Sequence, residues 1–155
     1  MQFTYVYDCI HDPASGNENE MNEMILVTGG TGYVAGWAIA DLLAQGFRVR
    51  TTLRSSSREQ AVRDAAAKAG AESGKLEFAI ADLTGDAGWD AAMHGVDYVL
   101  HVASPLSGEN TVADRYALVA PARDGTLRVL KAAVKAGVKR VVMTSAAATT
   151  RPSLN

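Results

Sequence analysis

Hydrophobic residues in this chain gather in short apolar runs that alternate with longer segments of helical spacing. The runs predict five strands, over residues 24–28, 47–54, 76–81, 97–103 and 139–145. The segments between them predict helices over residues 33–45, 57–69, 87–94 and 111–136. Gly46 and Gly137 mark two helix ends, and Pro121 is expected to kink or break the last helix. Strands that alternate with helices in this way are typical of βαβ units.

The strand pattern also predicts the topology of the sheet. Runs such as MILV, from Met24, and YVLHV, from Tyr98, are apolar at nearly every position, as in parallel strands buried on both faces. Because crossover connections are right-handed, few arrangements remain. We predict an α/β fold, a doubly wound parallel sheet of about five strands in the order 3-2-1-4-5. The apolar stripe on the last helix is expected to be core, at Leu127, Leu130, Val134 and Val138.

The first 23 residues differ from the rest of the chain. They are rich in polar residues and show no sustained period, so we expect residues 1–23 to be a flexible leader or a non-native extension. Met21 and Met24 are alternative natural starts. The folded domain is expected to span residues 24–155.

Composition narrows the possible functions. A chain of 155 residues with 48% hydrophobic and 21% charged residues fits one globular domain. A net charge of −2 gives no reason to expect nucleic acid or an anionic membrane as partner, and no apolar run approaches the ~20 residues of a membrane span. The single cysteine, Cys9, excludes an internal disulfide and fits a reducing, cytoplasmic location. With His11, His94 and His101 it lacks the spacing of metal ligands, so we predict no metal site.

A glycine turn directly after the first predicted strand carries the candidate chemistry. Gly29, Gly32 and Ala35 follow a G-x-x-G-x-x-A spacing where the strand ends and the first helix begins, and Gly36 adjoins the last position. Glycine allows a tight turn and a close approach to a ligand, and the helix N-terminus offers free N–H groups to a pyrophosphate. The pattern favours a dinucleotide. The alternative is that the glycines only make a tight strand-to-helix connection.

The end of the second strand indicates which dinucleotide. An acidic residue usually binds the ribose 2′-hydroxyl of NAD at this place, whereas this chain reads TTLRSSSR and has Arg54 there. A guanidinium suits a 2′-phosphate because it supplies charge and forked donors. We therefore expect NADP rather than NAD, with a solvated arginine as the alternative.

Four segments, in this order and spacing, carry a resemblance to a known family. They are VTGGTGYVAGW, VRTTLRS, ADLTGDAGWDAAMHGVDYVLHVASP and PARDGTLRVLKAAVKAGVKRVVMTSAAA. Together they resemble the extended short-chain dehydrogenases/reductases of the NAD-dependent epimerase/dehydratase superfamily, and within it the dihydroflavonol reductase/cinnamoyl-CoA reductase-like group. The resemblance implies a Rossmann-type fold, NADP as cofactor, and reduction of an aldehyde or ketone carbonyl of a small molecule by hydride transfer.

The resemblance also implies roles for individual residues. The pyrophosphate turn would be formed by Gly29, Thr31, Gly32, Tyr33 and Val34, and Arg54 would bind the 2′-phosphate. Asp82 and Leu83 would hold the adenine, and Val102, Ala103 and Ser104 would lie beside the ribose and nicotinamide. The Asp82 carboxylate would accept from the adenine amine, although a turn or N-cap aspartate is an equal alternative. His101 is expected to be a structural strand residue.

The chain departs from the family in its catalytic residues. The family uses a serine with a Y-x-x-x-K pair, yet none of the tyrosines at 5, 7, 33, 98 and 116 has a lysine four residues later. Ala146 occupies the place of the usual serine, and the neighbouring Ser145 is only a weak candidate. The sequence thus corresponds to the N-terminal, cofactor-binding part of the family and is predicted to be inactive alone.

Three other interpretations stay open at this stage. The chain could be a non-catalytic NADP-binding module, part of a nucleotide-sugar epimerase or dehydratase, or a fragment that folds only as an oligomer. Homo-oligomerisation is possible through the long last helix or the open sheet edge.

Overall fold

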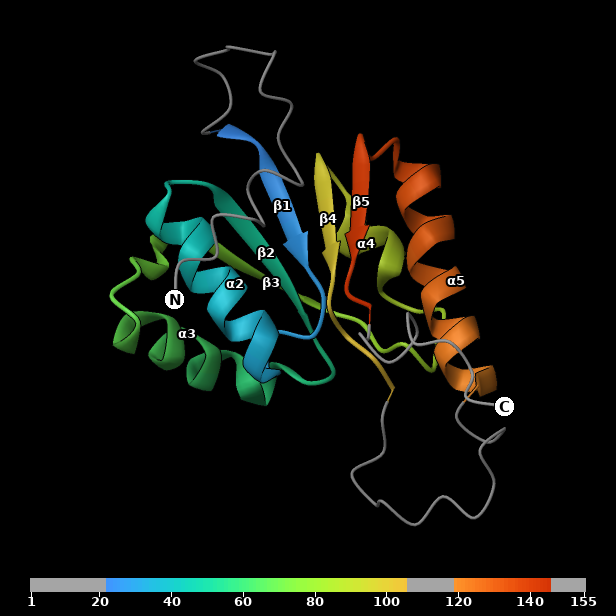
Figure 1. Cartoon of the computed structure of the whole chain (residues 1–155), viewed down its shortest axis with the longest axis horizontal. Coiled ribbons are helices and arrows are strands. Elements are labelled where there is room, and N and C mark those ends of the chain that lie inside the picture. The colour runs from blue at the N-terminus through green and yellow to red at the C-terminus, as the bar shows by residue number, and fades with distance from the viewer. Residues whose placement is uncertain (1–21, 106–118, 146–155) are drawn as a thin grey trace, which may run out of the picture.

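The computed structural model describes residues 22–105 and 119–145, and within them five parallel strands form one sheet (Figure 1). The strands are β1 (Met24–Val27), β2 (Arg48–Leu53), β3 (Leu76–Ile80), β4 (Tyr98–His101) and β5 (Arg140–Met143). Their order is β3-β2-β1-β4-β5, as predicted, and each strand is a little shorter than its apolar run. The strands β2 and β3 lie successively further from β1 on one side, and β4 and β5 do so on the other side, as in a doubly wound fold.

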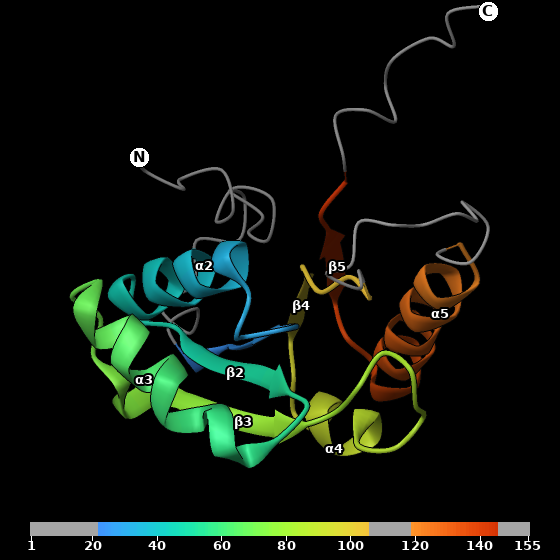
Figure 2. The same cartoon turned by 90° about the horizontal axis from the view of Figure 1, so that it is seen from below.

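Helices cover both faces of this sheet (Figure 2). The helices α2 (Tyr33–Ala44) and α3 (Glu59–Lys68) lie on one face, and α4 (Trp89–Met93) and α5 (Val119–Ala136) lie on the other. Single 3₁₀ turns, η2 (Ser56–Arg58) and η3 (Ser73–Lys75), precede α3 and β3. None of the described helices has both the length and the apolar character that crossing a bilayer requires.

The first helix ends as its sequence predicts. Gly46 has a φ of +92°, and its N–H donates to the carbonyl of Leu43. The N–H of Phe47 donates to the carbonyl of Leu42 at 3.1 Å. This pair of bonds is the Schellman motif, which needs a left-handed residue that glycine adopts without strain.

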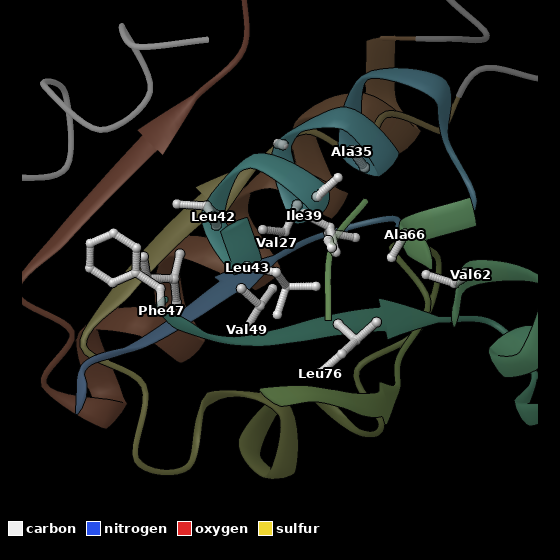
Figure 3. Packing of buried hydrophobic residues seen from close by; sticks show 14 of the residues in the cluster. Val27, Ala35, Ile39, Leu42, Leu43, Phe47, Val49, Val62, Ala66 and Leu76 are labelled. Carbon is white, nitrogen blue, oxygen red and sulfur yellow. The ribbon is translucent and has the colours of Figure 1, made fainter. Parts of the chain in front are cut away.

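The core is built on both faces of β1. Ile25 and Val27 point toward α2, where they pack with Ile39, Leu42 and neighbouring residues of β2 and α3 (Figure 3). Met24 and Leu26 point to the opposite face, where α4 and α5 cover them. All four residues of β1 are at most 2% exposed, which explains why the run MILV is continuous rather than alternating.

The last helix corrects one prediction and limits another. Its buried face consists of Gly125, Val129, Ala132 and Ala133, whereas Leu127 is 41% exposed and Val134 is 82% exposed. Leu127 and Val134 are therefore not core as we expected, because small residues bring this helix close to the sheet, whereas Leu130 is half-buried and Val138 packs against the core. Pro121 lies in the first described turn, and the helix continues past it; residues 111–118 lie outside the described part.

Ion pairs tie the strands together at the amino edge of the sheet. Arg48, at the start of β2, pairs with Glu77 of β3 at 3.1 Å, and Lys139 pairs with Glu23 and Asp97 at 2.9 Å. Arg50 hydrogen-bonds Glu77 as well and holds the pKa of that carboxyl below its usual range. Such partly exposed pairs contribute little stability each. The carboxyl edge of the sheet is arranged differently and contains a cavity.

The turn before α4 provides a test of the fold. Gly88 has a φ of +86°, and a Cβ at this position would lie 1.9 Å from the carbonyl oxygen of Ile80. Gly88→Ala is therefore expected to lower the free energy of unfolding by at least about 2 kcal/mol in urea denaturation. Gly85→Ala is the matched control, because a Cβ at Gly85 meets nothing within 4 Å. Equal stability of the two variants would contradict the described packing of this turn.

Candidate functional site

A cavity of about 630 Å³ lies at the carboxyl ends of four neighbouring strands. Its walls come from the segments that follow β1, β2, β3 and β4, so it occupies the place where the strand order reverses. Every residue for which we predicted a cofactor contact lines it, namely Gly29, Thr31, Gly32, Tyr33, Val34, Arg54, Asp82, Leu83, Val102, Ala103 and Ser104. In open α/β sheets this crevice is the usual ligand site.

The glycine turn is locked between β2 and β4. The N–H of Gly29 donates to Thr52 Oγ1 at 2.9 Å, and the N–H of Gly30 donates to the Thr52 carbonyl at 3.1 Å. Gly29 has a φ of +76°, and a Cβ there would lie 2.9 Å from the Cβ of Ala103. A side chain at Gly30 would meet Thr51 Oγ1 at 2.5 Å. The first two glycines are thus required by the turn itself, whatever it binds.

The N-terminus of α2 opens into the cavity. Gly32 is the N-cap, no side chain of the described residues caps the helix, and its first turn contains no acidic residue. The residues Gly32, Tyr33, Val34 and Ala35 line the cavity, so the positive end of the helix dipole and its unpaired N–H groups face that space. This arrangement suits an anionic ligand.

The structure decides which small residue lets α2 pack against the sheet. Ala35 is 1% exposed and belongs to the core, whereas a Cβ added at Gly36 would meet nothing within 4 Å. The third position of the glycine pattern is therefore Ala35, and Gly36 has no packing role.

The end of β2 and the loop after β3 form the opposite wall. Arg54 is exposed directly after β2, and its charge is one of the influences that lower the pKa of Asp82. The main cause of that lowered pKa is a hydrogen bond from the N–H of Thr84 to Asp82 Oδ1 at 2.9 Å, with the Thr84 hydroxyl on the same oxygen. Asp82 is thus a turn aspartate, as the alternative had it. Its contact with adenine stays a prediction.

Two residues that support this loop were missed by sequence reasoning. The indole N–H of Trp89 lies 3.1 Å from the carbonyl oxygens of both Asp82 and Gly85. Arg128, from α5, donates to the carbonyl of Leu83 at 2.8 Å and pairs with Asp86. Trp89 also lines the cavity. Neither role has a signal in the hydrophobic pattern, because both depend on how α4 and α5 meet the loop.

The segment after β4 is fixed by one hydroxyl. The N–H groups of Val102 and Ala103 both donate to Thr28 Oγ1 at 3.0 Å, and His101 Nδ1 lies 2.8 Å from the same oxygen. His101 is buried at the end of β4, where we expected a structural residue. These bonds set Val102 and Ala103 beside the glycine turn.

Two further predictions concern a catalytic role for Ser145 and the absence of a metal site. Ser145 is exposed just after β5 and does not line the cavity. Within residues 22–105 and 119–145, no three histidine, cysteine, aspartate or glutamate side chains gather as metal ligands would.

A second hollow adjoins the cavity between α2 and α3. It measures about 500 Å³ and shares Thr31, Gly32 and Tyr33 with the first, and Trp37 and Ala65 belong to its apolar lining. Its walls come from helices and the glycine turn rather than from the strand ends. The geometry of a strand-end crevice therefore favours the first cavity as the candidate site.

Comparison with known proteins gives a consistent family. The model of the NAD dependent epimerase/dehydratase family matches residues 25–152. Tetraketide alpha-pyrone reductase 2 of Arabidopsis thaliana is 39% identical over 81% of this chain, and dihydroflavonol 4-reductase of Dianthus caryophyllus is 33% identical over 86%. The resemblance to the dihydroflavonol reductase-like group is thus confirmed. The chain spans 40% and 36% of the lengths of these two relatives.

Solved structures of reductases have a similar fold. The crystal structure of yeast methylglyoxal/isovaleraldehyde reductase Gre2 complexed with NADPH superimposes with a TM-score of 0.67 at 25% identity. The superposition covers 79% of this chain and 37% of that one. The Rossmann-type fold is confirmed.

The two kinds of glycine in the turn give opposite predictions. Gly29→Ala is expected to lower the free energy of unfolding by about 1–3 kcal/mol, because it forces a side chain into the left-handed region. Gly36→Ala is expected to raise it by up to about 1 kcal/mol, because alanine is the better helix former and meets no neighbour. Urea denaturation of both variants tests this. Destabilisation by Gly36→Ala would restore a packing role to that position.

Proposed function

This chain belongs to the NAD dependent epimerase/dehydratase family, and on that premise we propose that it is the NADP-binding part of a short-chain-type oxidoreductase that reduces an aldehyde or ketone carbonyl. The observation that carries the proposal is the cavity at the strand ends. There the uncapped N-terminus of α2 and the guanidinium of Arg54 line the same space, so it offers two separate sites for phosphate groups.

Each wall of the cavity has a role in this proposal. The N–H groups at the start of α2 bind the pyrophosphate, and Arg54 binds the ribose 2′-phosphate that distinguishes NADP from NAD. The loop of Asp82 and Leu83 holds the adenine, and the segment Val102–Ser104 orients the nicotinamide end. When bound, NADPH supplies the hydride for carbonyl reduction. The chain's own residues bind the cofactor, orient it and shield it from water.

The choice of a reductase rests on the relatives. The curated proteins named above are reductases, and the yeast neighbour is a reductase in complex with NADPH. A nucleotide-sugar epimerase or dehydratase is the alternative that the family description keeps open. A non-catalytic NADP-binding module is the alternative that the missing Y-x-x-x-K pair keeps open.

Self-association belongs to the proposal as well. Leu127 and Val134 are exposed apolar residues on the outer face of α5, and Met143 is exposed on the edge strand β5. Exposed apolar residues and an open strand edge favour contact between copies of a chain. We therefore propose a homo-oligomer. The proposed substrate is a small carbonyl compound, and the proposed location is cytoplasmic.

Arg54 gives the sharpest test of cofactor choice. Arg54→Ala is expected to weaken NADP binding by about 10- to 100-fold, which corresponds to the loss of a charge-assisted hydrogen bond, and to leave NAD binding nearly unchanged. Calorimetric titration of both nucleotides measures the two effects.

The matched control lies on the same strand. Arg48→Ala removes the same charge from the opposite end of β2, at the amino edge, and should change neither affinity. A loss of NADP affinity that is equal in the two variants would mean that net charge, not a 2′-phosphate site, governs binding.

The absence of the tyrosine and lysine pair gives a second test. The 155-residue chain should bind NADPH yet show no oxidation of it with an aldehyde such as methylglyoxal, because its sequence has no Y-x-x-x-K pair to protonate the carbonyl oxygen. The absorbance of NADPH at saturating cofactor follows the reaction. Turnover would contradict the proposal that this chain binds the cofactor without catalysing the reaction, and it would require another proton donor.

A further inference from the structure

The hydroxyl of Thr28 lies at the junction of three segments that meet at the cavity. Thr28 follows β1 and precedes the glycine turn, and it is fully buried. Its Oγ1 accepts the N–H groups of Val102 and Ala103, each at 3.0 Å, and lies 2.8 Å from Nδ1 of His101. One side chain therefore joins the end of β1 to both the last residue of β4 and the segment that follows.

The hydrogen-bonding capacity of a hydroxyl group assigns the direction of the third bond. A threonine hydroxyl accepts two hydrogen bonds and donates one. Because two amide groups occupy both acceptor positions, the hydroxyl proton must point to His101 Nδ1. That nitrogen is then an acceptor, so the ring carries its proton on Nε2. Burial lowers the pKa of His101, which keeps the ring in the neutral form that this bond requires.

We propose that His101 is a positioning residue for the cavity: by accepting a hydrogen bond from the Thr28 hydroxyl, it fixes Thr28 Oγ1 as the common acceptor for the amide N–H groups of Val102 and Ala103. Without that acceptor, the hydroxyl would turn its proton toward another group, and the hydrogen bond from one of the two amide N–H groups would weaken.

The consequence reaches the glycine turn through one contact. Gly29 and Ala103 are packed so closely that a Cβ on Gly29 would lie 2.9 Å from the Cβ of Ala103. Thr28 also donates its own N–H to the carbonyl of Leu100 at 3.0 Å, so backbone as well as side chain joins the end of β1 to β4. Movement of the Val102–Ala103 segment would change the width of the cavity where we place the nicotinamide end. This effect on the cofactor rests on the proposed function.

The first test needs no variant protein. In the 155-residue chain with ¹⁵N-labelled histidine, NMR correlation of ring protons and nitrogens at pH 7 shows which nitrogen carries the proton. His101 is expected as the Nε2–H tautomer, and His101→Asn assigns its signals among those of His11 and His94. A ring protonated on Nδ1 would overturn the proposal, because that nitrogen could then accept no bond from Thr28.

The second test separates hydrogen bonding from packing. Asn and Leu have similar size and shape, but only Asn presents an oxygen in the place of Nδ1. Amide hydrogen exchange of Val102 and Ala103 is expected to be about tenfold faster in His101→Leu than in the unaltered chain, and close to normal in His101→Asn. The amides of Leu26 and Val49, which lie in the sheet core, are internal references.

The outcomes of this comparison are distinct. If the amides of Val102 and Ala103 are protected from hydrogen exchange in His101→Leu at least as well as in His101→Asn, His101 acts by packing alone and the proposal is wrong. If His101→Leu does not fold, two other results test the proposal: the tautomer of His101 in the unaltered chain, and the hydrogen-exchange protection of Val102 and Ala103 in His101→Asn.

Calorimetry with NADP extends the test to the cavity. His101→Leu should bind several-fold more weakly, and His101→Asn should bind nearly as well as the unaltered chain. Should the unaltered chain bind no NADP, the proposed function fails, while the tautomer and exchange measurements still test His101 as a positioning residue.

Discussion

The pairing of β1 with both of its neighbours is the constraint on which the whole site depends. Val27 lies opposite Thr51 of β2 on one side and opposite Leu100 of β4 on the other. In this register Thr28, the residue that follows β1, lies beside the end of β4, and its buried hydroxyl meets His101 Nδ1 and the N–H groups of Val102 and Ala103. A shift by one residue would turn the core residues of β1 to the other face and separate these groups. The fold of the sheet and the geometry of the turn are therefore one requirement.

The electrostatic character of the cavity follows from the same arrangement. The parallel strands end at one edge, so the segments after β1, β2, β3 and β4 surround one space. The start of α2 brings unpaired N–H groups to it, and Arg54 brings a full positive charge. At the amino edge, by contrast, the described charges are matched in pairs such as Arg48 with Glu77. The carboxyl edge thus turns positive groups toward the strand-end cavity, as an anionic cofactor requires.

Much of this arrangement can be predicted from the sequence because it depends on local pattern and topology. The order of the strands follows from βαβ alternation, and the residues around the cavity follow from their positions after each strand. The packing of α5 cannot be read in this way, since Leu127 and Val134 fit a helical stripe as well as Val129 and Ala133 do. Which stripe faces the sheet depends on small residues such as Gly125, which packs against Leu83. Likewise, Trp89 and Arg128 acquire their roles only when distant segments meet.

Asp82 has one role within the protein and a second, proposed role toward a ligand. Its turn geometry is visible in the bonds to Thr84, while a contact with adenine concerns a ligand. Of the three glycine-pattern positions, Gly29 and Ala35 have roles that the protein structure alone explains. The proposed function of the site therefore depends on the first N–H groups of α2, which no side chain of the described residues caps, and on the guanidinium of Arg54.

The most direct test of the central claim is an NMR titration of the ¹⁵N-labelled chain with NADP. The account predicts saturable shifts concentrated in the amides of residues 29–34, with further shifts after β2, β3 and β4 at Arg54, Asp82 and Ala103. Shifts confined to the hollow between α2 and α3, around Trp37 and Ala65, would place the ligand elsewhere. No shifts at millimolar NADP in a folded chain would contradict the assignment of this cavity as a cofactor site.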